Sequence, residues 1–325
     1  MFLKYALLYI TVIFFAVNLG GSGIAPSFAA IYGGRLLKKS WVLMLFGLFL
    51  TLGALSFGGR VSTTLGKNII PANLFTFDIA LAVIFSATLA IFVSNIFKVP
   101  QSTSLVTVGS IVGAGLFAGA INFKTFLWLL PAWIILPIVA FIITFLAFRK
   151  IYPPNAKNFW FYEKAHSWKG SLKVVALVAA CFVAFAVGAN NVANAVGPLW
   201  GAGLVSSPLL GILAIIPLFV LGAAVFGELT MGTIGKEIVP LGLITSSLVS
   251  FVTATLLSLA SFLGIPYPLV LLNGASILAI SSLKHGHVVA VRQAESRRMV
   301  LIWILAPFAA AAFTYLTLLL LQVLR

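Results

Sequence analysis

Residues 188–198 read Gly-Ala-Asn-Asn-Val-Ala-Asn-Ala-Val-Gly-Pro, in a chain of which 62% is hydrophobic. Asn190 and Asn194 are four residues apart, so they share one face of a helix or helix start, with Asn191 beside them. Polar groups are costly at membrane depth and therefore usually mark a substrate site. The residues also leave open a helix-packing seam, in which small side chains let backbones approach and the amides bond between helices.

The composition indicates an all-α polytopic membrane protein. Only 8% of the 325 residues are charged, and apolar runs recur that are long enough to cross a hydrocarbon core of roughly 30 Å. The one cysteine, Cys181, excludes an intrachain disulfide. We predict about ten membrane segments, with the following ranges: 2–19, 41–57, 74–97, 103–121, 126–148, 174–187, 208–226, 240–263, 267–283 and 299–322.

An internal repeat of about half the chain length organises these segments. Glycine, lysine, tryptophan and proline stay in step between the halves, which chance similarity between two apolar segments would not produce. The matched pairs are Phe57-Gly58 with Phe226-Gly227, Gly66-Lys67 with Gly235-Lys236, Trp133 with Trp303, Pro137 with Pro307, and Gly20 to Ser27 with Gly188 to Ala195. We therefore predict a first membrane repeat at 1–148, a basic and aromatic linker at 149–173, and a second repeat at 174–325.

The placement of charge indicates that the second copy is inverted. If all ten segments cross, fifteen of the twenty lysines and arginines share one side, and the linker at 149–173 is among them. Since cationic loops stay cytoplasmic, we expect both termini outside the cell membrane. An odd number of segments per copy turns the second copy over. If 103–121 and 267–283 were re-entrant, the copies would instead be parallel and most of the charge asymmetry would disappear.

Inverted repeats with segments broken by glycine and proline are typical of secondary transporters that bind substrate near the midplane. The broken segments at 20–34 and 188–203 would enter from opposite faces, and their helix starts would converge on an anion. A second constellation, residues 100–104 with Thr107 and Ser110, opens another segment with hydroxyls, which can alternatively bond back to their own helix. The predicted substrate-binding residues are Ser22, Gly23, Ser27, Asn190, Asn191, Asn194, Ser102, Thr103, Ser104 and Asn273.

The two polar motifs resemble signatures of one family. GANNVANAVGP at 188–198 resembles GANDVANA followed by GP, the signature of the inorganic phosphate transporter (PiT) family. PQSTSLVTVGSIVGAG at 100–115 resembles the PxSTTH segment of the same family, and the resemblance covers nearly the whole chain. Within the family the sequence is most similar to the sulfate permease branch, through NLGGSGIAPS at 18–27. The resemblance implies a two-copy transporter, and it makes a homodimer plausible.

The departures from the phosphate signature bear on the substrate. Gly23 and Asn191 stand where the family pattern has aspartate. Phosphate near neutral pH keeps a proton that a carboxylate can accept, whereas sulfate only accepts hydrogen bonds and suits amide, hydroxyl and N–H donors. The sequence thus favours a sulfate permease, with phosphate transport as the alternative and a passive anion channel behind it. We expect no enzyme, cofactor or metal, because no nucleophile, base or ligand constellation is visible.

The same missing aspartates weaken the case for sodium coupling and favour protons. Of five carboxylates in the chain, Glu228 is the first candidate for the titrating group and Asp78 the second. Each is equally well explained as an interfacial ion pair, with Lys236 and Lys67 respectively. The net charge of +15 reflects topology, with the linker at 149–173 lying against the anionic leaflet of the bilayer, and we see no nucleic-acid module.

Overall fold

The computed structural model describes residues 2–96, 102–167, 169–238, 242–286 and 294–323, and the regular elements in them are helical. Eight of the described helices are long and apolar enough to cross a membrane, and two shorter apolar helices accompany them, which confirms the predicted ten segments. The elements are α1 (Phe2–Gly33), α2 (Lys39–Gly53), the π-helix η1 (Ala54–Gly58), α3 (Gly59–Thr63), the π-helix η2 (Thr64–Asn68), the 3₁₀-helix η3 (Ala72–Leu74), α4 (Phe77–Ile96), α5 (Thr103–Phe117), α6 (Phe123–Ile151), α7 (Phe159–Ser167), α8 (Lys169–Gly201), α9 (Pro208–Ile238), α10 (Gly242–Phe262), α11 (Leu269–His285) and α13 (Ala294–Val323).

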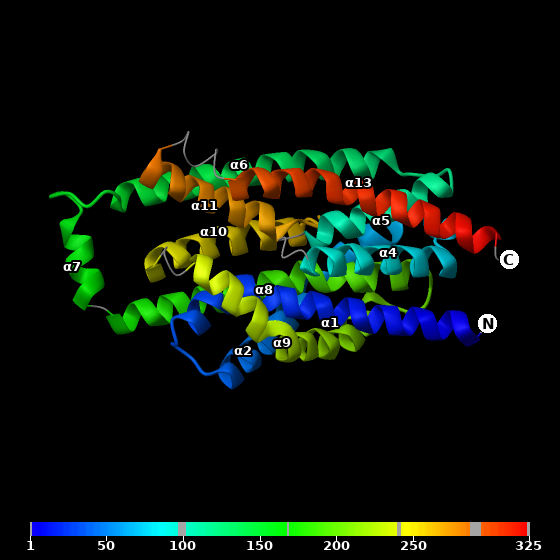
Figure 1. The fold of residues 1–325 in the computed structure, drawn as a ribbon, viewed down its shortest axis with the longest axis horizontal. Helices are drawn as coiled ribbons and strands as arrows, with labels where there is room; N and C mark the ends of the chain where they lie inside the picture. The colour runs from blue at the N-terminus through cyan, green and yellow to red at the C-terminus, as the bar shows by residue number, and fades with distance from the viewer. Residues whose placement is uncertain (1, 97–101, 168, 239–241, 287–293, 324–325) are drawn as a thin grey trace.

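Long helices run side by side along the molecule (Figure 1). Many large apolar side chains are exposed on its outer surface. On α6, for example, Leu127, Trp128 and Ile134 are 60–65% exposed. Such exposure would be unfavourable in water over so large an area, but it matches the hydrocarbon core of a bilayer. The first and last long helices begin and end at one end of the molecule, and α7 lies at the other (Figure 1).

The two segments predicted to be broken are continuous helices. α1 runs through 20–34 as far as Gly33, and α8 runs through 188–201, with Pro26 and Pro198 inside them. The prediction that these segments supply converging helix starts is therefore wrong. Glycine and proline are tolerated within membrane helices when neighbouring elements compensate for the lost interactions. Here the glycines serve close helix packing rather than a break in the helix.

The first of two hairpins is formed by α4 and α5. The start of α4 lies beside the start of α1, because Asp78 is 3.7 Å from Lys4. The end of α5 lies beside the end of η2, where the Asn122 N–H donates to the Ile69 carbonyl at 2.9 Å. Both places are at the end of the molecule that holds the N-terminus (Figure 1). The pair thus begins and ends on one side of the molecule, and the start of α5 is buried, with Ser102 3% and Ser104 1% exposed.

The second hairpin, α10 with α11, comes from the opposite end. Val249 near the start of α10 and Ile280 near the end of α11 share a small core with Phe148 of α6, close to the linker. The turn between α10 and α11 contains Gly264, whose backbone is in the left-handed region with a φ of +74°. Since each hairpin adds no net crossing, removing two segments from each half leaves an odd number. An odd number fits the inverted arrangement better than the parallel one, and the inversion itself stays a prediction.

Contacts between the halves recur at matched positions. Gly20 of α1 lies against the backbone of Phe219 in α9, and Gly188 of α8 lies against the backbone of Leu50 in α2. The corresponding residues are 168 or 169 positions apart in the chain. This symmetry supports the duplicated arrangement. The boundaries at 1–148, 149–173 and 174–325 stay a prediction, with α7 (Phe159–Ser167) falling inside the linker.

Candidate functional site

Asn190 makes four side-chain hydrogen bonds in the described interior. It is fully buried on α8, and its amide nitrogen donates to the Ser261 hydroxyl at 2.9 Å and to the Ile265 carbonyl at 3.0 Å. Its amide oxygen accepts from the Tyr267 N–H at 2.9 Å and from the Ser104 hydroxyl at 3.3 Å. These four bonds use both donors and both acceptor positions of the amide. Asn190 thereby joins α8 to the start of α5 and to the turn between α10 and α11.

Asn194 faces the start of α5, one turn further along α8. Its amide nitrogen lies 3.3 Å from the Thr103 hydroxyl and 3.4 Å from the Ser104 hydroxyl. Ser102 caps this helix by accepting from the Leu105 N–H at 3.1 Å. The first N–H groups of a helix have no partner within it and carry partial positive charge. Two predicted groups of residues, from α8 and α5, therefore meet at a helix N-terminus.

Two amide oxygens of the asparagine motif on α8 are buried without a hydrogen-bond partner. They belong to Asn191 and Asn194, and the Tyr267 hydroxyl is a third buried polar atom in the same condition. Native proteins satisfy most buried polar groups, so such atoms call for a ligand, a water or an ion. The protein's own groups therefore do not satisfy all the hydrogen-bonding atoms around the asparagine motif.

The described hydrogen bonds do not connect the candidates on α1 to this cluster. The Ser22 hydroxyl donates to the Leu19 carbonyl at 3.1 Å, and the Ser27 hydroxyl donates to the Gly23 carbonyl at 3.2 Å. Both hydroxyls bond back to their own helix, as serine often does in membrane helices. Asn273 is partly exposed on α11, and no described hydrogen bond links it to the cluster. Among the described residues, hydrogen bonds bring Asn190 and Asn194 of α8 together with the start of α5.

Gly23 occupies an apolar contact between helices. A Cβ atom at this position would lie 3.2 Å from the Val187 side chain and 3.8 Å from the Phe46 ring. An aspartate here, as in the phosphate signature, would place its side chain next to the hydrocarbon groups of Val187 and Phe46. This environment explains in physical terms why the position suits glycine in this chain.

Glu228 joins α9 to the ends of two other helices. It accepts from the Lys39 amine at 2.9 Å and from the Tyr32 hydroxyl at 3.0 Å, so α9 is tied to the start of α2 and the end of α1. The side chain is 58% exposed. Lys236, the partner predicted for it, lies outside the residues whose side chains are described. Glu228 is an ion-pair partner, as the sequence allowed, but it lies away from the asparagine cluster.

Asp78 lies at the start of α4, near the N-terminus. Its carboxylate is 3.7 Å from the Lys4 amine. Lys67, the partner predicted for it, places its amine 3.8 Å from the centroid of the Trp200 ring. Within the described residues, no group of three or more histidine, cysteine or acidic side chains is present that could hold a metal ion.

Several residues that hold the second hairpin tip were missed by the sequence analysis. Arg60 donates to the Phe262 carbonyl at 2.7 Å and lies over its ring, with 4.3 Å to the centroid. The Trp133 indole donates to the Pro266 carbonyl at 3.0 Å. The repeat of Trp133 at Trp303 was a signal, but the spacing alone does not say which backbone the indole reaches.

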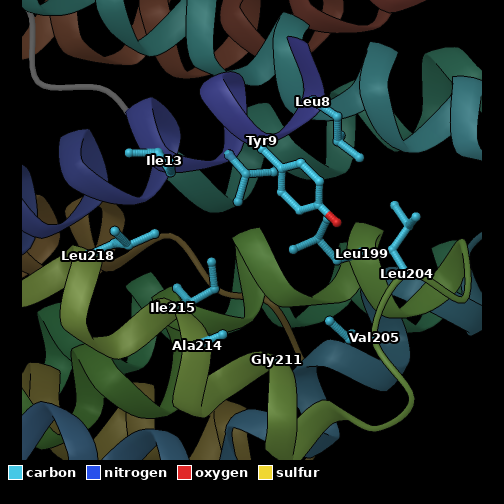
Figure 2. Close-up of a pocket in the computed structure, with 11 residues that line it drawn as sticks. Leu8, Tyr9, Ile13, Leu199, Leu204, Val205, Gly211, Ala214, Ile215 and Leu218 are labelled. Atoms are coloured by element: carbon cyan, nitrogen blue, oxygen red, sulfur yellow. The ribbon is translucent and has the colours of Figure 1, made fainter. Parts of the chain in front are cut away.

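A separate pocket lies between α1 and α9, with a volume of about 180 Å³ (Figure 2). The Tyr9 hydroxyl is the one polar side-chain group among the lining residues, which makes the pocket unsuited to an anion. The lining residues are Leu8, Tyr9, Val12, Ile13, Leu199, Leu204, Val205, Gly211, Ala214, Ile215 and Leu218.

The sequence matches the phosphate transporter family over residues 19–160 and 154–314. It is 35% identical to the sulfate permease CysP of Bacillus subtilis over 305 residues, covering 94% of this chain and 84% of that protein. It is 24% identical to a probable low-affinity inorganic phosphate transporter of the same organism, covering 86% of each. A putative phosphate permease of Thermococcus kodakarensis is also 24% identical, over 76% of this chain and 81% of that protein.

The fold matches a solved structure named the sodium-dependent phosphate transporter. The TM-score is 0.85, with 99% of this chain and 100% of that chain covered, at 22% sequence identity. At this identity the similarity supports the fold alone. What the asparagine cluster binds must be inferred from the geometry of the cluster itself.

Proposed function

The chain belongs to the phosphate transporter family, and from this premise we propose that it is a secondary transporter that imports a tetrahedral oxyanion, with sulfate as its substrate. The observation that carries the proposal is the buried side chain of Asn194, which lies against the Thr103 and Ser104 hydroxyls at the N-terminus of α5. Inverted halves with a polar site between them are the architecture expected of such carriers.

The substrate would lie where α8 faces the start of α5. The Asn194 amide and the Thr103 and Ser104 hydroxyls supply donors there, and the helix terminus adds N–H groups and partial positive charge. A sulfate ion in this position would replace the contacts that these groups now make with one another. The anion then accepts charge-assisted hydrogen bonds, which are roughly twice as strong as neutral ones.

Sulfate is favoured over phosphate by the absence of a signature carboxylate. Asn191 and Gly23 stand where the family pattern has aspartate, so the site adds no negative charge against a dianion. The relative that is 35% identical is named a sulfate permease, whereas the relatives named for phosphate are 24% identical. Both comparisons support the same choice.

Phosphate is the second candidate, and one observation favours it. The amide oxygens of Asn191 and Asn194 are buried acceptors without a donor, and the proton on hydrogen phosphate could supply one. Asparagine amides can turn by half a revolution and present nitrogen instead, because oxygen and nitrogen have nearly the same shape. The anion must therefore be identified by measurement of both.

Coupling to protons is part of the proposal, with Glu228 as the first titrating group and Asp78 as the second. Glu228 links elements of both halves through Lys39 and Tyr32, so its protonation would loosen their junction. It lies away from the bound anion and would act through helix movement. Sodium coupling is the alternative, suggested by the name of the structural neighbour.

The proposed orientation in the cell membrane has both termini outside and the linker at 149–173 in the cytoplasm. This arrangement places the six lysines and arginines of the linker on the inner side. The described linker helix α7 (Phe159–Ser167) carries Trp160, which is 60% exposed and suited to the bilayer surface. A homodimer is proposed as the assembly.

Purified protein in liposomes tests the function directly. Uptake of radiolabelled sulfate and of radiolabelled phosphate should be followed with proton and sodium gradients varied separately. We expect saturable sulfate uptake that accumulates against its gradient when the vesicle interior is alkaline. Phosphate preference would overturn the substrate assignment, sodium dependence would overturn the coupling ion, and flux without accumulation would indicate a channel.

A further inference from the structure

We propose that Asn190 is a positioning residue, which clamps the tip of the α10–α11 hairpin to α8, and that it does not bind the transported anion. The inference rests on the proposed function, because it divides the asparagines of one motif into a clamp and a ligand pair. It replaces the substrate-binding role that the sequence alone suggested for Asn190.

The tip of this hairpin is extended backbone in the interior of a membrane protein. Between the end of α10 and the start of α11, residues Ile265, Pro266 and Tyr267 are buried. Backbone N–H and C=O groups at such depth must be satisfied by protein, because the hydrocarbon core offers no water. The tip can therefore persist only if side chains from other elements complete it.

Asn190 completes the tip as a second peptide group would. Its amide nitrogen donates to the Ile265 carbonyl, and its amide oxygen accepts from the Tyr267 N–H. Pro266, between them, has no N–H, and its carbonyl accepts from the Trp133 indole. The Ile265 N–H donates to the Ala260 carbonyl at 2.8 Å. Each backbone polar group from Ile265 to the Tyr267 N–H thus has a partner.

The saturation of Asn190 separates it from its neighbours. With its second hydrogen on Ser261 and its second acceptor position on Ser104, the amide has nothing left for an anion. Its orientation is also unambiguous, because a backbone carbonyl accepts and a backbone N–H donates. Asn191 and Asn194, by contrast, each keep an oxygen without a partner.

The hydroxyl of Ser104 makes the clamp responsive to substrate. A hydroxyl has one hydrogen, and in this structure the Ser104 hydroxyl donates it to Asn190. An anion at the start of α5 would accept the hydrogen bond of the Ser104 hydroxyl in place of Asn190. The α4–α5 hairpin would then lose its hydrogen bond to Asn190. The other three bonds of Asn190 hold the α10–α11 tip in place meanwhile, so the two hairpins become free to move separately.

Thiol labelling of the tip tests the clamp without any substrate. In a Cys181→Ser background, Ile265→Cys places one thiol at the buried tip, and its reaction with a maleimide in purified protein reports opening. Adding Asn190→Ala should raise the labelling rate about tenfold or more, because the tip loses its backbone partners. Asn194→Ala is the matched control, equally buried on the same helix, and should leave the rate within about twofold.

The isosteric variant Asn190→Asp covers the case in which the alanine variant does not fold. A carboxylate keeps the acceptor for Tyr267 but has no hydrogen for Ile265, so labelling should rise at neutral pH relative to the parent. Acidification should bring the rate of Asn190→Asp back towards that of the parent at the same pH, since a protonated carboxyl donates again. A merely steric role for Asn190 would show no such dependence.

Sulfate titration completes the test. Asn190→Ala should lower the maximal rate of uptake while the KM changes less than about threefold, whereas Asn194→Ala should raise the KM by about tenfold or more. Unchanged tip labelling together with a raised KM in Asn190→Ala would make Asn190 a ligand and overturn the inference. If the parent transports neither sulfate nor phosphate, the proposed function fails, and the labelling result still decides whether Asn190 is a clamp.

Discussion

Gly188 of α8 lies directly against the backbone carbonyl of Leu50 in α2, in a contact too close to admit a side-chain carbon. The same relationship recurs in the other half, where Gly20 of α1 lies against the backbone of Phe219. These contacts set the distance between α8 and its neighbour. They consequently determine how far the asparagines that follow Gly188 reach towards the hairpin tips.

Replacement of Gly188 by alanine should therefore destabilise the fold. The added methyl would meet backbone atoms that cannot move aside, and overpacking of this kind costs about 1–3 kcal/mol or more. Thermal unfolding of the detergent-solubilised protein, followed by size-exclusion chromatography, measures the loss. Gly170→Ala in the same helix is the control, because nothing lies within 4 Å of its Cβ. An equal effect of both variants would contradict the packing role of Gly188.

Replacement of Asn194 by alanine should weaken sulfate binding. The variant removes a donor to a charged ligand, which is worth roughly 1.5–3 kcal/mol, or about one to two decades in Kd. Isothermal titration with sulfate provides the measurement. Asn18→Ala is the control, since the Asn18 amide donates at 2.7 Å to the Phe14 carbonyl of its own helix. Parental affinity in Asn194→Ala would assign this amide to packing between α8 and α5.

Restoring an acid with Asn191→Asp should weaken sulfate binding at neutral pH. The Asn191 oxygen is buried, so a carboxylate there would repel a dianion unless a proton or a cation relieved the charge. Binding should recover at lower pH or in the presence of sodium. Titration of sulfate and phosphate at two pH values, with and without sodium, checks this. Unchanged sulfate affinity would show that position 191 does not discriminate between anions.

Replacement of Glu228 by glutamine should uncouple transport from the proton gradient. The amide keeps the shape of the side chain and its contact with Tyr32, but it neither titrates nor pairs ionically with Lys39. Accumulation driven by an alkaline vesicle interior should be lost, while exchange of labelled for unlabelled sulfate continues. Asp78→Asn distinguishes the second candidate. If both variants accumulate sulfate normally, neither carboxylate couples transport to protons.

Labelling of single cysteines in intact cells should place the linker inside and both ends outside. In the Cys181→Ser background, a cysteine at Lys157 should be protected from a membrane-impermeant maleimide, and cysteines appended to either terminus should react. Labelling after cell lysis provides the control for accessibility. A reactive linker with protected termini would reverse the proposed orientation, and opposite results at the two termini would exclude it.

The sequence by itself determined the helical membrane class, the ten segments, the family and the polar residues that cluster. Hydropathy and helical periodicity are local properties, so runs such as 174–187 identify a membrane segment without knowledge of its neighbours. Asn194, Thr103 and Ser104 were candidates because their polarity is unusual inside such segments. The prediction that these residues lie close together followed from one assumption, namely that both motifs contact the same substrate.

The tertiary structure decided which helix starts reach the interior and which polar groups remain free. Glycine and proline at 20–34 and 188–203 fit either a broken helix or a close crossing, and only the neighbouring backbone chooses between them. The same holds for Asn190. Its amide is saturated because Ile265 and Tyr267, more than seventy residues further along the chain, present a carbonyl and an N–H to it. Hydrogen bonds between such distant residues depend on how the helices pack, and local sequence does not encode that packing by itself.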